Sequence, residues 1–166
     1  DHDGQPVRGV CSNYLCDLAA GASIRITGPM GDSFLMPESA RIPLLMICTG
    51  TGIAPMRGML QRRLRRDGAQ GAPMLLLYGA RSRDELPYAD ELDTCAAPAL
   101  ELRTALSRVP GRPKRYVQQL VDESAARVAR LVLEDGACIY VCGLSAMEHE
   151  IDAALGRAIT AAGRDW

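Results

Sequence analysis

Two glycines that follow an apolar run are the first feature of this sequence that could do chemistry. The run Pro43–Cys48 leads into TGTGIAP, residues Thr49–Pro55. Gly50 and Gly52 permit a tight turn and let a ligand approach the backbone, while the start of a following helix offers free N–H groups. This turn predicts a phosphate site. It is not the full G-x-G-x-x-G fingerprint, and glycines kept for packing alone would give the same pattern.

A basic segment, SRVPGRPKRY, follows the third apolar run. Its chemically useful residues are Ser107, Arg108, Arg112, Lys114, Arg115 and Tyr116. Donors and cations of this kind suit a ribose 2′-phosphate, and the Tyr116 ring could stack on the adjacent adenine. Two charge-assisted contacts would give about a hundredfold preference for NADP over NAD. The alternative is a solvated basic loop without a ligand.

A cysteine followed by glycine forms the third signal, within YVCGL, Tyr140–Leu144. The alternative for Cys142 is a core thiol, because free cysteine often behaves as a small hydrophobe. The six cysteines are Cys11, Cys16, Cys48, Cys95, Cys138 and Cys142. They contain no C-x-x-C pair, so we predict reduced structural thiols, with neither a disulfide framework nor a metal site.

Alternating apolar runs and amphipathic segments must position these three signals. The runs are Pro43–Cys48, Met74–Tyr78, Leu100–Leu106 and Cys138–Cys142. Such alternation is typical of βαβ units that build a parallel sheet covered by helices on both faces. Since the carboxyl ends of parallel strands share one edge, the three signals should converge there.

The helices between the runs have recognisable ends. Pro55 stands in the first turn of one helix, and the basic stretch QRRLRR, residues 61–66, should lie on its solvated outer face. Ser145 with Glu148 predicts a capping box at the start of the last helix, and Gly163 predicts its end.

The first forty residues have a different pattern. A short segment, Cys11–Leu18, leads to an alternating strand, Ser23–Thr27, and a Gly28–Pro29 turn. This pattern is typical of an antiparallel barrel edge. We therefore predict two domains, the remnant of a barrel over residues 1–38 and an α/β domain over residues 39–166.

Length, composition and charge limit the possible classes of protein. The chain has 166 residues, 48% apolar and 23% charged, as in an ordinary globular protein. Nineteen basic against twenty acidic residues leave a net charge of −1, so no positive field favours nucleic acid. No apolar run reaches the ~20 residues that cross a bilayer, and the N-terminus lacks a signal-peptide pattern. These features predict a cytoplasmic protein without a membrane partner.

Five segments together resemble the plant-type ferredoxin–NADP reductase family. They are GVCSNYLCDL (9–18), ITGPMGDSFLMP (26–37), TGTGIAPMR (49–57), SRVPGRPKRYVQ (107–118) and CGLSAMEHEID (142–152), in the family's order. The resemblance implies an antiparallel FAD-binding barrel followed by a Rossmann-like five-stranded parallel sheet that binds NADP, with the last strand truncated here. It also implies hydride transfer from NADPH to FAD and single-electron transfer to an iron–sulfur carrier or oxygenase.

The resemblance assigns roles residue by residue. Val10, Cys11 and Ser12 would contact the flavin phosphates. Thr49 would lie near the flavin and nicotinamide, and Gly50, Thr51 and Gly52 would pass close to the NADP pyrophosphate. The 2′-phosphate and adenine would be held by Ser107, Arg108, Lys114 and Tyr116, with Gln118 alongside. Cys142 would lie near the nicotinamide C4, beside a wall formed by Gly143, Leu144 and Glu148.

The sequence differs from the family pattern in three respects. The flavin-binding R-x-Y-S motif would lie upstream of residue 1, and Trp166 matches an interior position, so the chain is expected to be an inactive fragment. Asp32 stands where many relatives have lysine, which removes a basis for predicting how ferredoxin docks. The alternatives are an NADP-binding module without redox activity and a methyltransferase-like α/β domain, although the latter leaves the basic segment unexplained.

Overall fold

The chain divides into two compact units, Asp1–Ser33 and Phe34–Trp166. A computed structural model describes residues 8–28, 31, 34–68, 71–95 and 100–166. None of the helices within these ranges has the length and apolar character to cross a bilayer.

Among its described residues, the first unit contains one short helix, α1 (Val10–Cys16), which buries none of its residues. The strand predicted over Ser23–Thr27 is wrong, because these residues form no strand in the structure. Alternating side chains make a strand only when a neighbouring strand completes its backbone hydrogen bonds. Residues 8–28 provide no such neighbour.

The second unit is built on a parallel sheet of four strands among the described residues. They are β1 (Leu44–Thr49), β2 (Met74–Ala80), β3 (Leu100–Leu106) and β4 (Cys138–Cys142). Their order is β3-β2-β1-β4. Leu44 pairs with Met74 on one side and with Cys138 on the other. The four predicted apolar runs and the predicted α/β fold class are confirmed.

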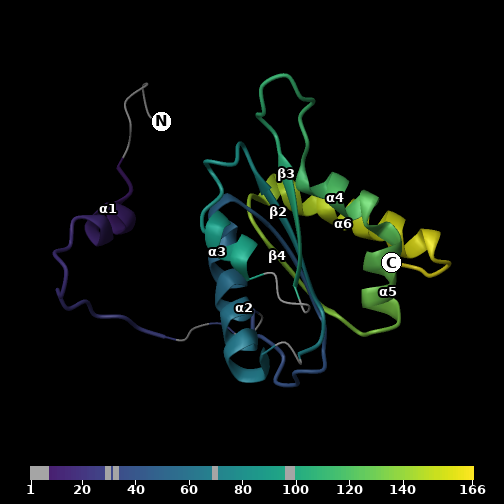
Figure 1. Ribbon diagram of the computed structural model, residues 1–166, viewed down its shortest axis with the longest axis horizontal. Helices are drawn as coiled ribbons and strands as arrows, with labels where there is room; N and C mark the ends of the chain where they lie inside the picture. Colours follow the sequence, from purple (N-terminus) through teal and green to yellow (C-terminus); the bar gives the residue numbers. More distant parts are fainter. Residues whose placement is uncertain (1–7, 29–30, 32–33, 69–70, 96–99) are drawn as a thin grey trace. The chain divides into compact units, whose positions relative to one another are not determined.

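Helices cover both faces of the sheet (Figure 1). The short turn η1 (Gly50–Gly52) leads into α2 (Ile53–Asp67), which lies with α3 (Ala89–Thr94) on one face. The other face carries α4 (Val117–Glu123), α5 (Ala125–Leu133) and α6 (Ser145–Ala161). Strand residues alternate between two cores accordingly.

Alternation along β1 shows how one strand serves both cores. Met46 packs with Met56 and Leu60 of α2, whereas its neighbour Ile47 packs with Leu155 of α6. All of these side chains are buried, as expected for a parallel strand that is covered on both faces. The core therefore fixes α2 and α6 on opposite sides of the same strand.

The strand order reverses between β1 and β4. From β1 the chain proceeds through β2 to β3 on one side, then returns to place β4 on the other side of β1. Because α2 and α6 leave these two strands toward opposite faces, a crevice opens at their carboxyl ends. Open α/β sheets bind ligands at such a switch point.

The sequence predicted both ends of α6, and only one of the two predictions is confirmed. Gly163 has a φ of +79° just after α6, a left-handed conformation suited to glycine, so the predicted stop is confirmed. The capping box predicted from Ser145 and Glu148 is wrong, because the N-cap is Leu144 and no side chain caps the helix. The helix begins one residue earlier than the motif requires, which makes Ser145 its first helical residue instead of its N-cap.

The predicted solvation of residues 61–66 is wrong for Arg63. Its side chain is fully buried and donates to the carbonyl oxygens of Ala40 at 2.8 Å and Ile42 at 3.1 Å. A buried guanidinium needs such acceptors, because its hydration is lost on burial. Arg63 thereby joins α2 to the segment that leads into β1.

Candidate functional site

A cavity of about 760 Å³ opens at the carboxyl ends of the strands. Its volume is within the range of small-molecule and cofactor sites, roughly 300–1,000 Å³. The predicted site residues that line it are Thr49, Gly50, Thr51, Gly52, Ser107, Tyr116, Gln118, Cys142, Gly143 and Leu144. The cavity thus brings together the ends of β1, β3 and β4, as the sequence predicted.

Packing allows only glycine at one position after β1 and one position after β4. A Cβ on Gly52 would overlap the carbonyl oxygen of Cys142 and lie 2.8 Å from its carbonyl carbon. On Gly143, a Cβ would lie 2.6 Å from Cε of Met147. Gly50 instead has a φ of +53°, which the tight turn requires. Gly52 therefore lets η1 touch β4, whereas Gly50 shapes the turn itself.

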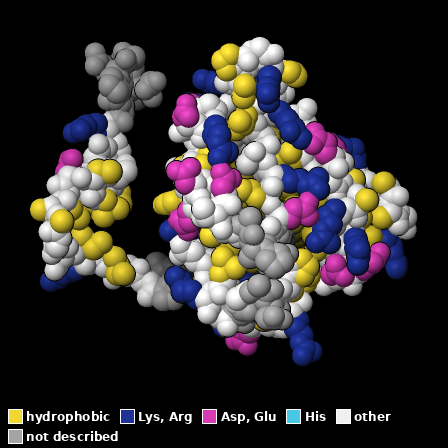
Figure 2. Space-filling view, viewed as in Figure 1, with side chains coloured by type: hydrophobic (Ala, Val, Ile, Leu, Met, Phe, Trp, Pro, Cys, Tyr) yellow, Lys and Arg dark blue, Asp and Glu magenta, His cyan; other side chains and the backbone are white. Residues whose placement is uncertain are grey.

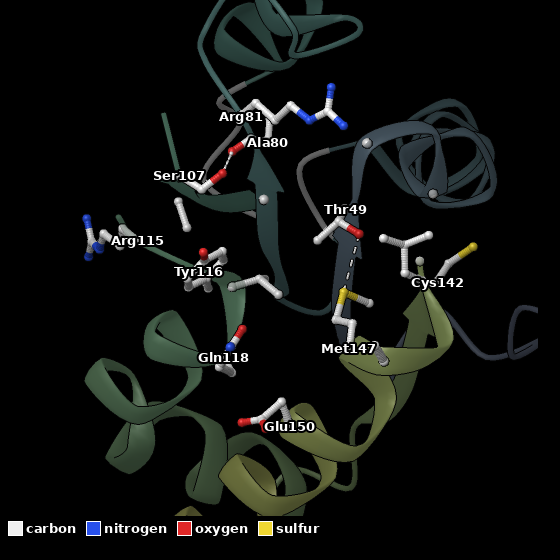
Figure 3. Close-up of a pocket in the computed structure, with 18 of the residues that line it drawn as sticks. Thr49, Ala80, Arg81, Ser107, Arg115, Tyr116, Gln118, Cys142, Met147 and Glu150 are labelled. Atoms are coloured by element: carbon white, nitrogen blue, oxygen red, sulfur yellow. Dashed lines mark hydrogen bonds between the residues drawn. The ribbon is translucent and has the colours of Figure 1, made fainter. Parts of the chain in front are cut away.

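Thr49 connects the end of β1 to α6 through its side chain. Its hydroxyl donates to the sulfur of Met147, at 3.3 Å, and Figure 3 shows this contact across the cavity wall. Gly79 leaves room for the methyl group of Thr49, since a Cβ there would lie 2.9 Å from it. The side chain of Thr49 is therefore held from two directions before any ligand binds.

Two cysteines lie side by side in the sheet, since Cys48 of β1 is in register with Cys142 of β4. Cys48 is fully buried, whereas Cys142 is partly exposed and lines the cavity. Burial, with a smaller effect of Cys142, raises the pKa of Cys48 well above its usual range, so this thiol stays protonated at neutral pH. Cys142 is the thiol that a ligand can reach.

The backbone holds both ends of the basic segment. The N–H groups of Ser107 and Arg108 donate to the carbonyl oxygens of Ala80 at 3.0 Å and Arg81 at 2.7 Å. The N–H of Arg115 donates to Leu106 O at 3.2 Å. Between these anchors the segment bulges from the sheet edge.

Cations surround this bulge. The side chains of Arg108, Arg112, Lys114 and Arg115 are exposed. Figure 2 shows Lys and Arg side chains around the loop that projects at the top of the view, where Figure 1 places the connection from β3 to α4. Only Arg115 among these four lines the cavity, and it forms an ion pair with Glu123.

Some predicted site residues lie outside the cavity wall. Arg108, Lys114 and Glu148 are exposed and do not line it. Val10, Cys11 and Ser12 belong to the first turn of α1 in the other unit. Asp32 lies outside the described residues. The roles proposed for these residues remain predictions.

Sequence reasoning missed four charged or polarisable side chains of the cavity, namely Arg81, Glu85, Met147 and Glu150. Arg81 directly follows β2, so the rule that selected the ends of the other strands could have found it. Met147 and Glu150 lie in the first two turns of α6, where the resemblance to the reductase family selected Glu148 instead.

Comparison with known proteins agrees with this geometry. A family model described as the oxidoreductase NAD-binding domain matches residues 46–153, from within β1 to the first half of α6. The chain belongs to this family. The matched range includes the glycine turn, the basic segment and Cys142.

Curated relatives are ferredoxin–NADP reductases, which confirms the resemblance to that family. The enzyme of Spirulina sp is 36% identical, over 98% of this chain and 58% of the relative. The leaf-type chloroplastic isozyme of Nicotiana tabacum is 37% identical, over 90% of this chain and 44% of the relative. The cyanelle enzyme of Cyanophora paradoxa is 36% identical, over 100% of this chain and 48% of the relative. The chain spans about half the length of the curated relatives it matches.

Proposed function

We propose that this chain is the NADP-binding part of a flavin-dependent reductase. One observation carries the proposal: the glycine turn after β1, the basic segment after β3 and the Cys142–Gly143 pair after β4 surround a single cavity at the switch point of the sheet. A dinucleotide phosphate needs a close backbone approach, cations for its phosphates and a surface for its flat rings. The cavity offers each of these at a different strand end.

The residues present fit the cofactor. Gly50, Thr51 and Gly52 form a turn at the start of α2, where free N–H groups suit a pyrophosphate. Ser107 and the exposed ring of Tyr116 suit a phosphorylated adenosine, with Arg108 and Lys114 as cations on the adjoining loop. When bound together, NADPH supplies a hydride and FAD accepts it.

Cys142, Gly143 and Thr49 are proposed to position the nicotinamide. Gly143 has no side chain to obstruct a flat ring, and the Thr49 hydroxyl is restrained by Met147. Cys142 adds a polarisable thiol at the end of β4. Because packing restrains Thr49 and Gly143, these residues would orient the ring without a rearrangement on binding.

We infer from the relatives that the whole protein passes electrons singly to an iron–sulfur carrier or an oxygenase. The flavin site would include Val10, Cys11 and Ser12 of the first unit. The segment SRVPGRPKRYVQ, together with GARSRDELPY (79–88), most resembles the reductase component of bacterial benzoyl-CoA 2,3-epoxidase. We therefore propose a role in aerobic benzoyl-CoA degradation, which reconstitution of the full-length reductase with the epoxidase component would test through NADPH-dependent epoxide formation.

Calorimetric titration of the 166-residue chain with NADP⁺ and NAD⁺ tests the proposed function. We expect NADP⁺ to bind at least about tenfold more tightly, because the 2′-phosphate gains charge-assisted contacts. Equal affinities, or no binding of either nucleotide to folded protein, would contradict it. In the full-length protein, a yellow cofactor that NADPH bleaches would support the reductase, whereas a colourless NADP-binding protein would support the module without redox activity.

A further inference from the structure

Glu150 is a carboxylate of the cavity wall that neither packing nor pairing explains. It lies in the second turn of α6, is exposed and lines the cavity. Among the residues that the structure describes, it has no hydrogen-bond or ion-pair partner. The cation that senses its charge is Arg157, whose guanidinium donates to both carboxylate oxygens of Asp122 at 3.0 and 2.8 Å.

Glu150 lies on the same side of the cavity as two residues that begin α4. Figure 3 shows it projecting from α6 on the side where Tyr116 and Gln118 project from the start of α4. Arg81 and Arg115 project elsewhere around the opening, following β2 and preceding α4. Each of these two cations is ion-paired with a carboxylate, Arg81 with Glu85 and Arg115 with Glu123, whereas Glu150 lies at another place on the wall without such a pair among the described residues.

A carboxylate in a site for a phosphorylated ligand weakens binding unless it accepts a hydrogen bond from a neutral donor. Glu150 can only accept hydrogen bonds while ionised. On the adenosine half of a dinucleotide, neutral donors are the exocyclic amine of the base and the sugar hydroxyls. The half-exposed ring of Tyr116, at 47% exposure, offers a stacking face for the base on the same side of the cavity, so the edge of the base is the nearer candidate.

We propose that Glu150 selects adenine by accepting a hydrogen bond from its exocyclic amine. The inference rests on the proposed NADP site and adds a specificity-determining residue to it. Hypoxanthine carries a carbonyl oxygen in place of this amine. Glu150 would repel that oxygen, whereas a glutamine at the same position could donate to it.

Calorimetric titration of the 166-residue chain with two nucleotides tests the proposal. The nucleotides are NADP⁺ and its deamino analogue, nicotinamide hypoxanthine dinucleotide phosphate. We expect the natural chain to prefer NADP⁺ by about fivefold, the effect of one exposed charge-assisted hydrogen bond. In Glu150→Gln the preference should disappear or reverse, through tighter binding of the deamino analogue.

Glu134→Gln is the matched control, because Glu134 is exposed at the end of α5, outside the cavity, and its loss changes the net charge equally. It should keep the preference of the natural chain. An unchanged preference in Glu150→Gln would overturn the proposal, as would an equal change in affinity for both nucleotides, which would indicate charge repulsion or a sugar contact. Failure of the natural chain to bind NADP⁺ would instead overturn the proposed function itself.

Discussion

The two ends of the cavity are specified by different physics. At the ends of β1 and β4, glycines touch backbone and a hydroxyl bonds to sulfur, so little space remains for another atom. The segment Ser107–Tyr116 is anchored at its ends and leaves its cations exposed. Substitutions that change side-chain size in the first region should lower stability, whereas the loss of a charge there should have little effect. In the second region the loss of a charge should weaken binding, whereas a change in size should have little effect.

The strongest test of this contrast is Gly52→Ala. The new methyl group would collide with the backbone of Cys142, which has no flexible end to move aside. We expect unfolding in urea to show a loss of about 2–4 kcal/mol in stability.

Gly58→Ala is the matched control for that substitution. Gly58 lies within α2, and a Cβ there would meet nothing within 4 Å. It should leave stability unchanged or raise it by about 0.5–1 kcal/mol, because alanine favours helix. Equal effects of the two substitutions would contradict the packing role of Gly52.

Removal of charge from the basic loop should give a smaller effect, confined to binding. The double substitution Arg108→Ala and Lys114→Ala should weaken NADP⁺ binding by about 10- to 100-fold and change NAD⁺ binding little, because only the 2′-phosphate loses its cations. Stability should stay within about 0.5 kcal/mol of the natural value, as is usual for exposed side chains. Calorimetry and urea unfolding measure the two quantities.

Arg62→Ala with Arg65→Ala gives the same change in net charge on the exposed side of α2. This control should keep the preference for NADP⁺. If both double variants lost it equally, the effect would reflect the overall field of the protein and not a phosphate site.

The smallest expected effect concerns the bond between Thr49 and Met147. Valine at position 49 keeps the shape of threonine and removes the donor. We expect a loss of about 0.5–1 kcal/mol, the worth of a modest hydrogen bond. A double-mutant cycle with Met147→Leu should assign about half a kcal/mol to the pair itself; additive effects would mean that the contact contributes nothing.

The same contrast explains how far the sequence could be interpreted. Apolar runs locate β1 and β2 most clearly, because a strand that is buried on both faces must be apolar throughout, whereas the edge strand β3 also carries Glu101 and Arg103. Parallel order then places Thr49, Ser107 and Cys142 at one edge. Gly52 could be identified as part of a turn, but its contact with Cys142 joins residues ninety positions apart and leaves no local pattern.

Arg63 and Glu150 show a second reason why the sequence did not predict the surroundings of some side chains. Both are charged residues on helices, for which exposure to solvent is the ordinary expectation. Their surroundings are decided by what packs across the helix, the carbonyl groups of residues 40 and 42 for Arg63 and the cavity for Glu150. Helical spacing alone does not distinguish a side chain that meets solvent from one that meets another segment.

The burial of Arg63 also affects how the segment before β1 can move. To lift Ala40 and Ile42 from the end of α2, the chain would have to break two hydrogen bonds and leave a guanidinium without its acceptors, which is costly in a dry environment. Partial detachment is therefore unfavourable, and this joint should hold or open as a whole. A displacement of the residues before Ala40 would therefore move α2 together with the segment 40–42, because the two are joined by these hydrogen bonds.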